Sequence, residues 1–227
     1  MKIRKFRYLI ILVVFLCLGC ATHNGLSDDQ IKMDQDYEYA MNVYTGQNGE
    51  EQDYDKAVSL FSASAKNNDI RAQVFLGIIY VYGAGVNVDY KKARTLLEKA
   101  AERGHPKALF QMGDLYFKGR GVKQDYEQAM IFYKKSALKG DKWAQLSLGN
   151  MYLSGKSIEK NYKTAFEWYE KSALQGNDIA QFNVGFMYES GVGIMQNTEK
   201  ALEWYKKSAQ QDNKEAQKRL KILLGAN

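Results

Sequence analysis

Few side chains in this sequence are spaced as reacting groups would be. Ser136 and Lys139 stand three residues apart, like the nucleophilic serine and the proton-moving lysine of serine β-lactamases. Ser136 belongs to a repeat that is described below, and three other serines stand at the equivalent position of that repeat. None of them has a lysine three residues later: Ser64, Ser172 and Ser208. Because no S-D-N or K-T-G motif follows, we interpret Ser136 as a packing residue.

The glycine pairs and the histidines offer little chemistry either. The pairs at 83 and 85, 119 and 121, and 191 and 193 lack the third glycine of a phosphate-binding loop, so a turn between helices explains them better. The only histidines, His23 and His105, are far apart, which argues against a metal site or a triad. The carboxylates form no distinctive pair. We therefore expect that the protein is not an enzyme and that it binds no metal, cofactor or small-molecule substrate. The less favoured alternative is a β-lactamase-like or cell-wall enzyme.

The first twenty residues have the layout of a secretory signal. Four basic residues between Lys2 and Arg7 precede an apolar run from Tyr8 to Leu18. A helix that spans a bilayer needs roughly 20 apolar residues, so this run is too short for a permanent membrane helix. Export followed by cleavage is the interpretation that fits, and an uncleaved or conventionally cleaved signal is the alternative.

The segment Leu16-Cys17-Leu18-Gly19-Cys20 resembles the lipobox of bacterial lipoproteins, although Cys17 stands where leucine is usual. The resemblance implies that Cys20 carries a lipid anchor in a membrane of the cell envelope. Ala21 after it resembles the residue that directs enteric-type lipoproteins to the outer membrane, facing the periplasm. No cysteine follows Cys20, so the exported part forms no disulfide.

The charge of the chain excludes nucleic acid as the expected partner. The formal net charge is +6, from 32 Lys and Arg against 26 Asp and Glu. Without the four basic residues of the signal, 28 basic side chains remain, and the net charge falls to +2. A nearly balanced chain has little long-range attraction for phosphate.

A repeat of 36 residues organises the rest of the sequence. Alanines recur at this spacing, and an apolar residue and glycine follow most of them, with tyrosine three residues further on. The alanines are Ala72, Ala108, Ala144, Ala180 and Ala216. The pattern predicts two helices in each repeat, which we name helix A and helix B. In the second repeat helix A runs from Ala72 to Tyr82, and helix B starts at Asp89. The residues at the start of helix B can all cap it: Asp53, Asp89, Asp125, Asn161 and Asn197.

The repeats resemble the Sel-one-like repeat family, relatives of tetratricopeptide repeats. The motifs that carry the resemblance are LGIIYVYGAGVNVDYKKA, MGDLYFKGRGVKQDYEQA and VGFMYESGVGIMQNTEKA. The resemblance implies an all-α fold, an α/α superhelical solenoid, with helix A on its concave side and a role in binding proteins. We predict a signal at 1–19, Cys20 and a polar tether at 20–35, a degenerate first repeat at 36–71, repeats at 72–107, 108–143, 144–179 and 180–215, and a capping helix at 216–227.

The fourth, seventh and eleventh residues of helix A vary between repeats and share one helical face. At the N-terminal end this face is apolar, and exposed aromatic residues are the commonest hot spots of interfaces. The predicted partner-binding residues are Tyr39, Phe75, Ile78, Tyr82 and, at a distance, Phe186. The other possibility is that the first repeat or residues 22–35 cover this face as a cap.

We therefore expect an envelope-anchored scaffold that binds a protein partner in the groove of its A helices. Similar lipoproteins act in polysaccharide export, envelope signalling, host-cell entry or immunity to secreted toxins. The alternative that makes the sharpest prediction is an immunity protein that neutralises a lipase-type toxin, because it requires tight binding of one enzyme.

Overall fold

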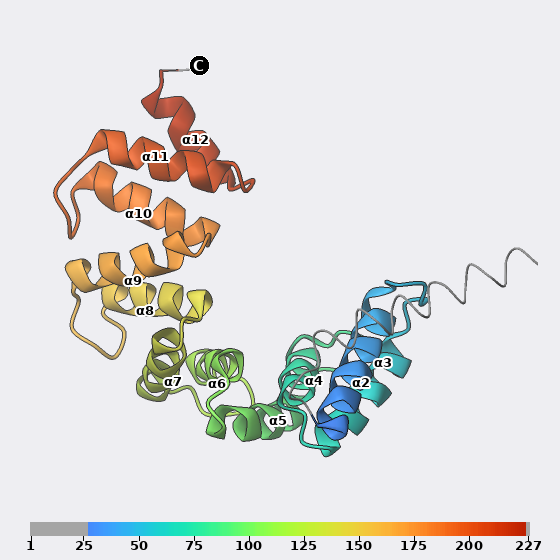
Figure 1. Ribbon diagram of the computed structural model, residues 1–227. Coiled ribbons are helices and arrows are strands. Elements are labelled where there is room, and N and C mark those ends of the chain that lie inside the picture. The colour runs from blue at the N-terminus through green and yellow to red at the C-terminus, as the bar shows by residue number, and fades with distance from the viewer. Residues whose placement is uncertain (1–26, 226–227) are drawn as a thin grey trace, which may run out of the picture. The chain divides into compact units, whose positions relative to one another are not determined.

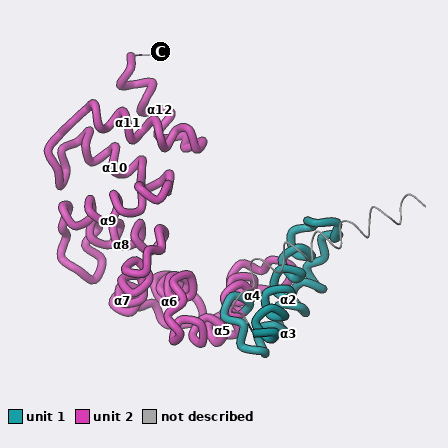
Figure 2. The backbone as a smooth tube through the Cα atoms, in the orientation of Figure 1, with its two compact units in different colours: residues 1–72 teal, residues 73–227 magenta. Residues whose placement is uncertain are grey.

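The computed structural model describes residues 27–225, and within that range the chain forms eleven α-helices and no strand. The expected all-α repeat fold is confirmed. The chain divides into two compact units, residues 1–72 and residues 73–227, and the division falls inside α4 (Ile70–Tyr82) (Figure 2). None of the helices in the described range is both long and apolar enough to cross a membrane.

The first unit contains α2 (Asp28–Thr45) and α3 (Tyr54–Lys66), which pack against each other. Helix α2 begins eight residues before the predicted first repeat, so residues 28–35 are helical and do not form the expected tether. The Ser27 hydroxyl caps this helix by accepting the backbone N–H of Gln30 at 3.2 Å. Val43 and Phe61 are fully buried between the two helices.

The second unit is a run of helices in which each one from α5 onward packs against the next (Figure 1). These helices are α5 (Tyr90–Glu102), α6 (Pro106–Lys118), α7 (Tyr126–Leu138), α8 (Lys142–Ser154), α9 (Tyr162–Leu174), α10 (Asp178–Ser190), α11 (Thr198–Ala209) and α12 (Lys214–Leu223). The even-numbered helices from α4 to α12 correspond to helix A of the repeat. The odd-numbered helices correspond to helix B.

The predicted caps of the B helices are confirmed. Each predicted side chain accepts the backbone N–H three residues on, at 2.9 Å: Asp53, Asp89, Asp125, Asn161 and Asn197. A helix start leaves backbone donors without intrahelical partners, and these side chains satisfy one donor each. The 36-residue period of the sequence therefore reflects the positions at which the B helices start.

The A helices begin two residues before the predicted alanine. Asp141, Asn177 and Asn213 cap α8, α10 and α12 by accepting the N–H of the repeat alanine. At the same place before α6 stands His105, which makes no such side-chain bond, and Pro106 follows it as the first helical residue. Proline fits there because it has no N–H that needs a partner.

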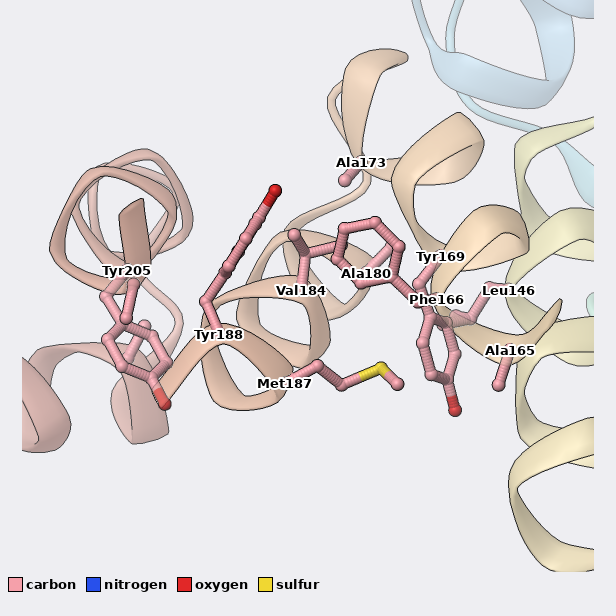
Figure 3. Packing of buried hydrophobic residues seen from close by; sticks show 12 residues of the cluster. Leu146, Ala165, Phe166, Tyr169, Ala173, Ala180, Val184, Met187, Tyr188 and Tyr205 are labelled. Carbon is pink, nitrogen blue, oxygen red and sulfur yellow. The ribbon is translucent and has the colours of Figure 1, made fainter. Parts of the chain in front are cut away.

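Glycine inside each A helix from α4 to α10 allows a bulky side chain of helix B to approach. A methyl group at Gly113 would lie 2.6 Å from Cδ1 of Tyr133, and one at Gly185 would lie 2.9 Å from Cδ1 of Tyr205. Contacts this close are repulsive, so only glycine fits under the rings. Figure 3 shows side chains of α10, among them Met187, between Tyr169 of α9 and Tyr205 of α11.

Hydrogen bonds between side chains and backbone tie three B helices, α7, α9 and α11, to the helices beside them. The buried hydroxyls of Ser136, Ser172 and Ser208 each donate to the backbone carbonyl oxygen 30 residues earlier, at 2.7 Å. The side-chain amide of Gln145 donates to the carbonyl of Ala137, and its own oxygen accepts a hydrogen bond from Gln175. The repeat is thus held by polar bonds as well as by its apolar core.

Candidate functional site

The A face is the surface formed by the fourth, seventh and eleventh residues of each repeat in the second unit, counted from the repeat alanine. In the third repeat, counted from Ala108, these are Gln111, Asp114 and Lys118. The apolar members of the A face differ in exposure, with Tyr82 at 56%, Phe186 at 41%, and Phe75 and Ile78 half-buried. Tyr39 belongs to the first unit, where its ring is 38% exposed. The A face is therefore only partly available as an apolar surface.

Cations lie beside two of the predicted aromatic residues. The ammonium group of Lys56 is 5.1 Å from the ring centroid of Tyr39, and the guanidinium group of Arg219 is 5.7 Å from that of Phe186. Such pairs are attractive because the ring face carries negative partial charge. Both rings are held in place, and each keeps an exposed part for contact.

A pocket of about 350 Å³ brings Tyr82 together with the third-repeat part of the A face. We name it the Gln111 pocket, and it is lined by Tyr82, Lys107, Phe110, Gln111, Asp114, Lys118 and Trp143. Gln111, Asp114 and Lys118 occupy the repeat positions that predict this face, whereas Lys107 and Trp143 do not. These last two residues stand one helical turn before the fourth residue of a repeat, so the same periodicity extended backwards would have found them.

A second pocket of about 310 Å³ meets the A face in the fourth repeat. Its lining is largely apolar, and it includes three polar A-face residues: Ser147, Asn150 and Ser154. The ammonium group of Lys156 lies 5.1 Å from the ring centroid of Phe117 and 5.2 Å from that of Tyr126. Both pockets lie where the third and fourth repeats contribute to the A face.

Some of the variable residues of the A face serve packing between helices and are not free for recognition. The hydroxyl of Tyr133 donates to Asp114 at 2.9 Å, and that of Tyr169 donates to Asn150 at 2.7 Å. Both acceptors are seventh residues of their repeats. Burial raises the pKa of both tyrosines far above 10, so the hydroxyls stay protonated as donors.

Electrostatics in the Gln111 pocket leave one lysine without a carboxylate partner. Lys118 forms an ion pair with Asp114, whose other oxygen accepts the Tyr133 hydroxyl. Lys107 forms no ion pair within the part of the chain that the structure describes. Burial raises the pKa of the neighbouring Asp141, although the backbone bonds of its capping role and the charge of Lys107 oppose that shift. The lining of the pocket therefore carries two cations and one carboxylate, and Asp141 beside it interacts with Lys107 without forming an ion pair.

Ser136 does not have the surroundings of a nucleophile. Its side chain is fully buried, and its hydroxyl donates to the carbonyl oxygen of Pro106 at 2.7 Å. The same bond recurs at Ser172 and Ser208, which have no lysine three residues on. The structure thus explains the serine by packing, as the sequence analysis predicted.

The glycine pairs form turns between helices. Gly119 ends α6 in the left-handed conformation, at φ 66°, and Gly121 follows at φ 68°. A methyl group at Gly121 would lie 2.5 Å from Cβ of Tyr90. Within residues 27–225, no three His, Cys, Asp or Glu side chains are grouped as metal ligands. Burial lowers the pKa of His105, which favours its neutral form. Cys20 and His23 lie outside the described residues.

Known proteins share this repeat. The sequence model of the Sel1 repeat matches residues 36–69, 70–105, 106–141, 144–177 and 178–213. Among solved structures, a Sel1 repeat protein from Oxalobacter formigenes is 33% identical, with a TM-score of 0.80, over 87% of this chain and 81% of that one. None of the curated proteins compared with this chain matches it.

Two further solved structures are similar. The c5321 protein of uropathogenic Escherichia coli, described as a protective antigen with an SLR fold, is 35% identical with a TM-score of 0.76, over 86% of this chain. This chain spans 42% of that protein. The immunity protein Pa5087 of Pseudomonas aeruginosa is 24% identical with a TM-score of 0.57, over 82% of this chain and 68% of that one, and this likeness shows the fold alone.

Sel1 repeat proteins generally bind other proteins, and their fold is typically a scaffold without enzymatic activity. The repeats matched by the sequence model cover most of the chain, and the Oxalobacter formigenes structure is similar over nearly its whole length. The chain therefore belongs to the Sel1 repeat family.

Proposed function

We propose that this protein is an adaptor of the cell envelope, anchored by a lipid on Cys20, that binds one protein partner on its A face. The observation that carries the binding surface is the Gln111 pocket, where Tyr82 and Trp143, at 56% and 41% exposure, share one indentation. Exposed aromatic side chains beside a pocket have the size and rigidity of interface hot spots.

The rigidity of the A helices supports this surface. In α6 and α8 the A-face residues stand between residues that are buried in the core, among them Met112, Leu115, Leu148 and Met151. A surface fixed in this way loses little conformational entropy when a partner binds. The A face is therefore suited to recognition without rearrangement.

The lipid anchor is supported by the sequence from Leu16 to Cys20. Ala21 after the cysteine supports placement in the outer membrane, facing the periplasm. Radiolabelled palmitate incorporated into the wild-type protein but not into a Cys20→Ala variant, together with fractionation of the envelope, tests both parts of this proposal. An unlabelled wild-type protein would refute the anchor and leave the binding surface untouched.

The binding surface is tested by affinity capture from envelope extracts with the wild-type protein and a variant that carries Phe75→Ala and Tyr82→Ala. We expect one protein to be retained by the wild type and lost with the variant. Tyr162→Ala is the matched control, because Tyr162 is a 44% exposed tyrosine outside the A face. Equal retention by all three proteins would refute the A face as the binding surface.

A melting curve of each variant separates binding from folding. Unchanged melting with lost capture supports a groove, whereas a lower melting temperature indicates that the two side chains pack under a cap. The identity of the retained protein also decides between a scaffold and an immunity protein, because neutralisation of a secreted lipase-type toxin requires that enzyme to be the captured protein. The similarity to the Pseudomonas aeruginosa immunity protein shows only the fold, so it does not favour the immunity role.

A further inference from the structure

The Gln111 pocket contains a buried hydrogen-bond acceptor that has no donor. The side chain of Gln111 is 5% exposed, and its Oε1 atom lacks a hydrogen-bond partner among the described residues. Buried polar atoms in folded proteins are nearly always paired, because desolvation without a hydrogen bond is unfavourable. The Gln111 side chain lines a pocket that is open to solvent, so a ligand that carries an N–H or O–H group would supply the missing bond once the amide turns toward it.

Two other buried glutamines, both at the second position of their repeats, have paired oxygens. Gln145 and Gln181 are equally buried, and their Oε1 atoms accept hydrogen bonds from Gln175 and Gln211 at 2.8 Å. Gln111 stands at the fourth position of its repeat, which Ser147 and Asn183 occupy in the next two repeats, so its unpaired acceptor is a feature of this pocket.

The charges around Gln111 favour an anion. Asp114 is already engaged by Lys118 and by the hydroxyl of Tyr133, so it does not neutralise a second cation. Lys107 in the first turn of α6 remains exposed at the rim of the same pocket. A carboxylate placed there would gain the attraction of Lys107 and of the partial positive charge at the helix start.

The walls of the pocket favour an apolar or aromatic side chain beside that anion. Tyr82 and Trp143 offer exposed ring surface, and Phe110 adds a half-buried ring. A volume of about 350 Å³ is at the lower end for ligand pockets, and it suits a short stretch of chain with one large side chain.

We propose that the Gln111 pocket binds an extended acidic segment of the partner protein. A backbone N–H of the segment donates to Oε1 of Gln111, an Asp or Glu side chain of the segment pairs with Lys107, and an adjacent apolar or aromatic side chain packs between Tyr82 and Trp143. An extended peptide fits these features because its main chain offers a donor at nearly every residue. This inference rests on the proposed function and names the chemistry of the partner at the same surface.

The test uses three pools of fluorescein-labelled decapeptides. Each peptide has a central aromatic residue, defined positions on both sides of it, and random residues elsewhere. The flanking positions carry Asp or Glu in the first pool, Asn or Gln in the second, and Lys or Arg in the third. Binding to the full chain in detergent is measured by fluorescence polarisation. We expect the acidic pool to bind about tenfold more tightly than the amide pool, and added salt to reduce the difference.

Two variants place the binding in the pocket. Lys107→Glu should abolish the preference for the acidic pool, whereas Gln111→Leu should weaken binding about tenfold and raise the melting temperature, because it removes an unpaired buried acceptor. The matched control is Lys214→Glu, which makes the same charge change in the first turn of α12, outside the pocket. It should leave the preference unchanged.

The inference is overturned if the amide or basic pool binds as tightly as the acidic pool, or if the acidic preference survives Lys107→Glu. It is also overturned if no pool binds. If partner capture then still depends on Phe75 and Tyr82, the acidic segment is refuted and the proposed function stands. If that capture also fails, the binding surface itself is refuted.

Discussion

Three buried tyrosines at the same place in successive repeats differ in the acceptor of their hydroxyl. Tyr133 donates to a carboxylate, that of Asp114, at 2.9 Å, whereas Tyr169 donates to the amide oxygen of Asn150 at 2.7 Å. The third, Tyr205, donates to a carboxylate oxygen of Glu189 at 2.5 Å. Replacing each tyrosine by phenylalanine removes the hydroxyl and keeps the ring over the glycine, so the three substitutions differ only in the lost hydrogen bond.

The expected losses of stability follow from the charge and exposure of the acceptors. A hydrogen bond between neutral groups contributes about 1 kcal/mol, and one to a charged group about 2 kcal/mol. The side chain of Asp114 is 16% exposed and that of Glu189 is 22% exposed, whereas Asn150 is exposed and can be hydrated in the variant. We expect Tyr169→Phe to cost about 1 kcal/mol and each of the other two about 2 kcal/mol.

Urea denaturation followed by circular dichroism measures these differences through the shift of the midpoint at constant slope. Exchanging the acceptors provides the control. In an Asp114→Asn background the cost of Tyr133→Phe should fall by about 1 kcal/mol, and in an Asn150→Asp background the cost of Tyr169→Phe should rise by about the same amount. Equal losses at all three tyrosines, or costs that do not change when the acceptors are exchanged, would refute the reasoning.

The remaining predictions concern backbone conformation, helix capping and close packing. Ser157 has a left-handed backbone, at φ 57°, so Ser157→Gly should raise the free energy of unfolding by about 1 kcal/mol in urea denaturation. His105→Asn should stabilise the chain by about 1 kcal/mol, because it provides at α6 the cap that Asn177 provides at α10. Burial lowers the pKa of His105, so the wild type should lose stability as the pH falls below 6.5, the usual value, and melting curves across that range should show a smaller loss for the variant. Gly149→Ala should cost about 2 kcal/mol in the same denaturation assay, since the new methyl group would overlap the ring of Tyr169, and a gain in stability would contradict the packing described here.

The repeat and its helix starts were predictable because their causes are local. An aspartate or asparagine caps the helix that begins at the next residue, and a glycine after an apolar residue recurs wherever a B-helix side chain packs closely. The predicted starts of the B helices, such as Asp89 and Asn161, agree with the structure. The A helices start two residues earlier than predicted, and Asp141 and Asn177, also 36 residues apart, would have shown this.

The beginning of α2 was missed although its signal is in the sequence. Ser27 followed by Gln30 is a start signal of the capping-box type, and the acidic Asp28 and Asp29 suit the first turn of a helix. The polar composition of residues 28–35 suggested a tether instead. Composition was the weaker guide there, because a helix start depends on single residues.

The arrangement of the candidate site was only partly predictable. Helical periodicity placed Gln111, Asp114 and Lys118 on one face, but which of these polar groups are already paired depends on side chains 19 or more residues away, such as Tyr133. Periodicity also cannot show that Gln111 is buried and lacks a donor. Such facts arise from packing between helices, which no single segment encodes.

The serine hydroxyl bonds have a genetic consequence. Each joins a B helix to a carbonyl 30 residues earlier, so no bond of this type reaches beyond the adjoining helix hairpin. If codons 144–179 were lost by unequal recombination, the carbonyl of Lys142 would stand where that of Asp178 stood, and Ser208 would find the same acceptor. Gene segments of 36 codons can therefore be gained or lost without breaking a bond of this type, which makes the length of the array a trait that selection can adjust separately from the fold.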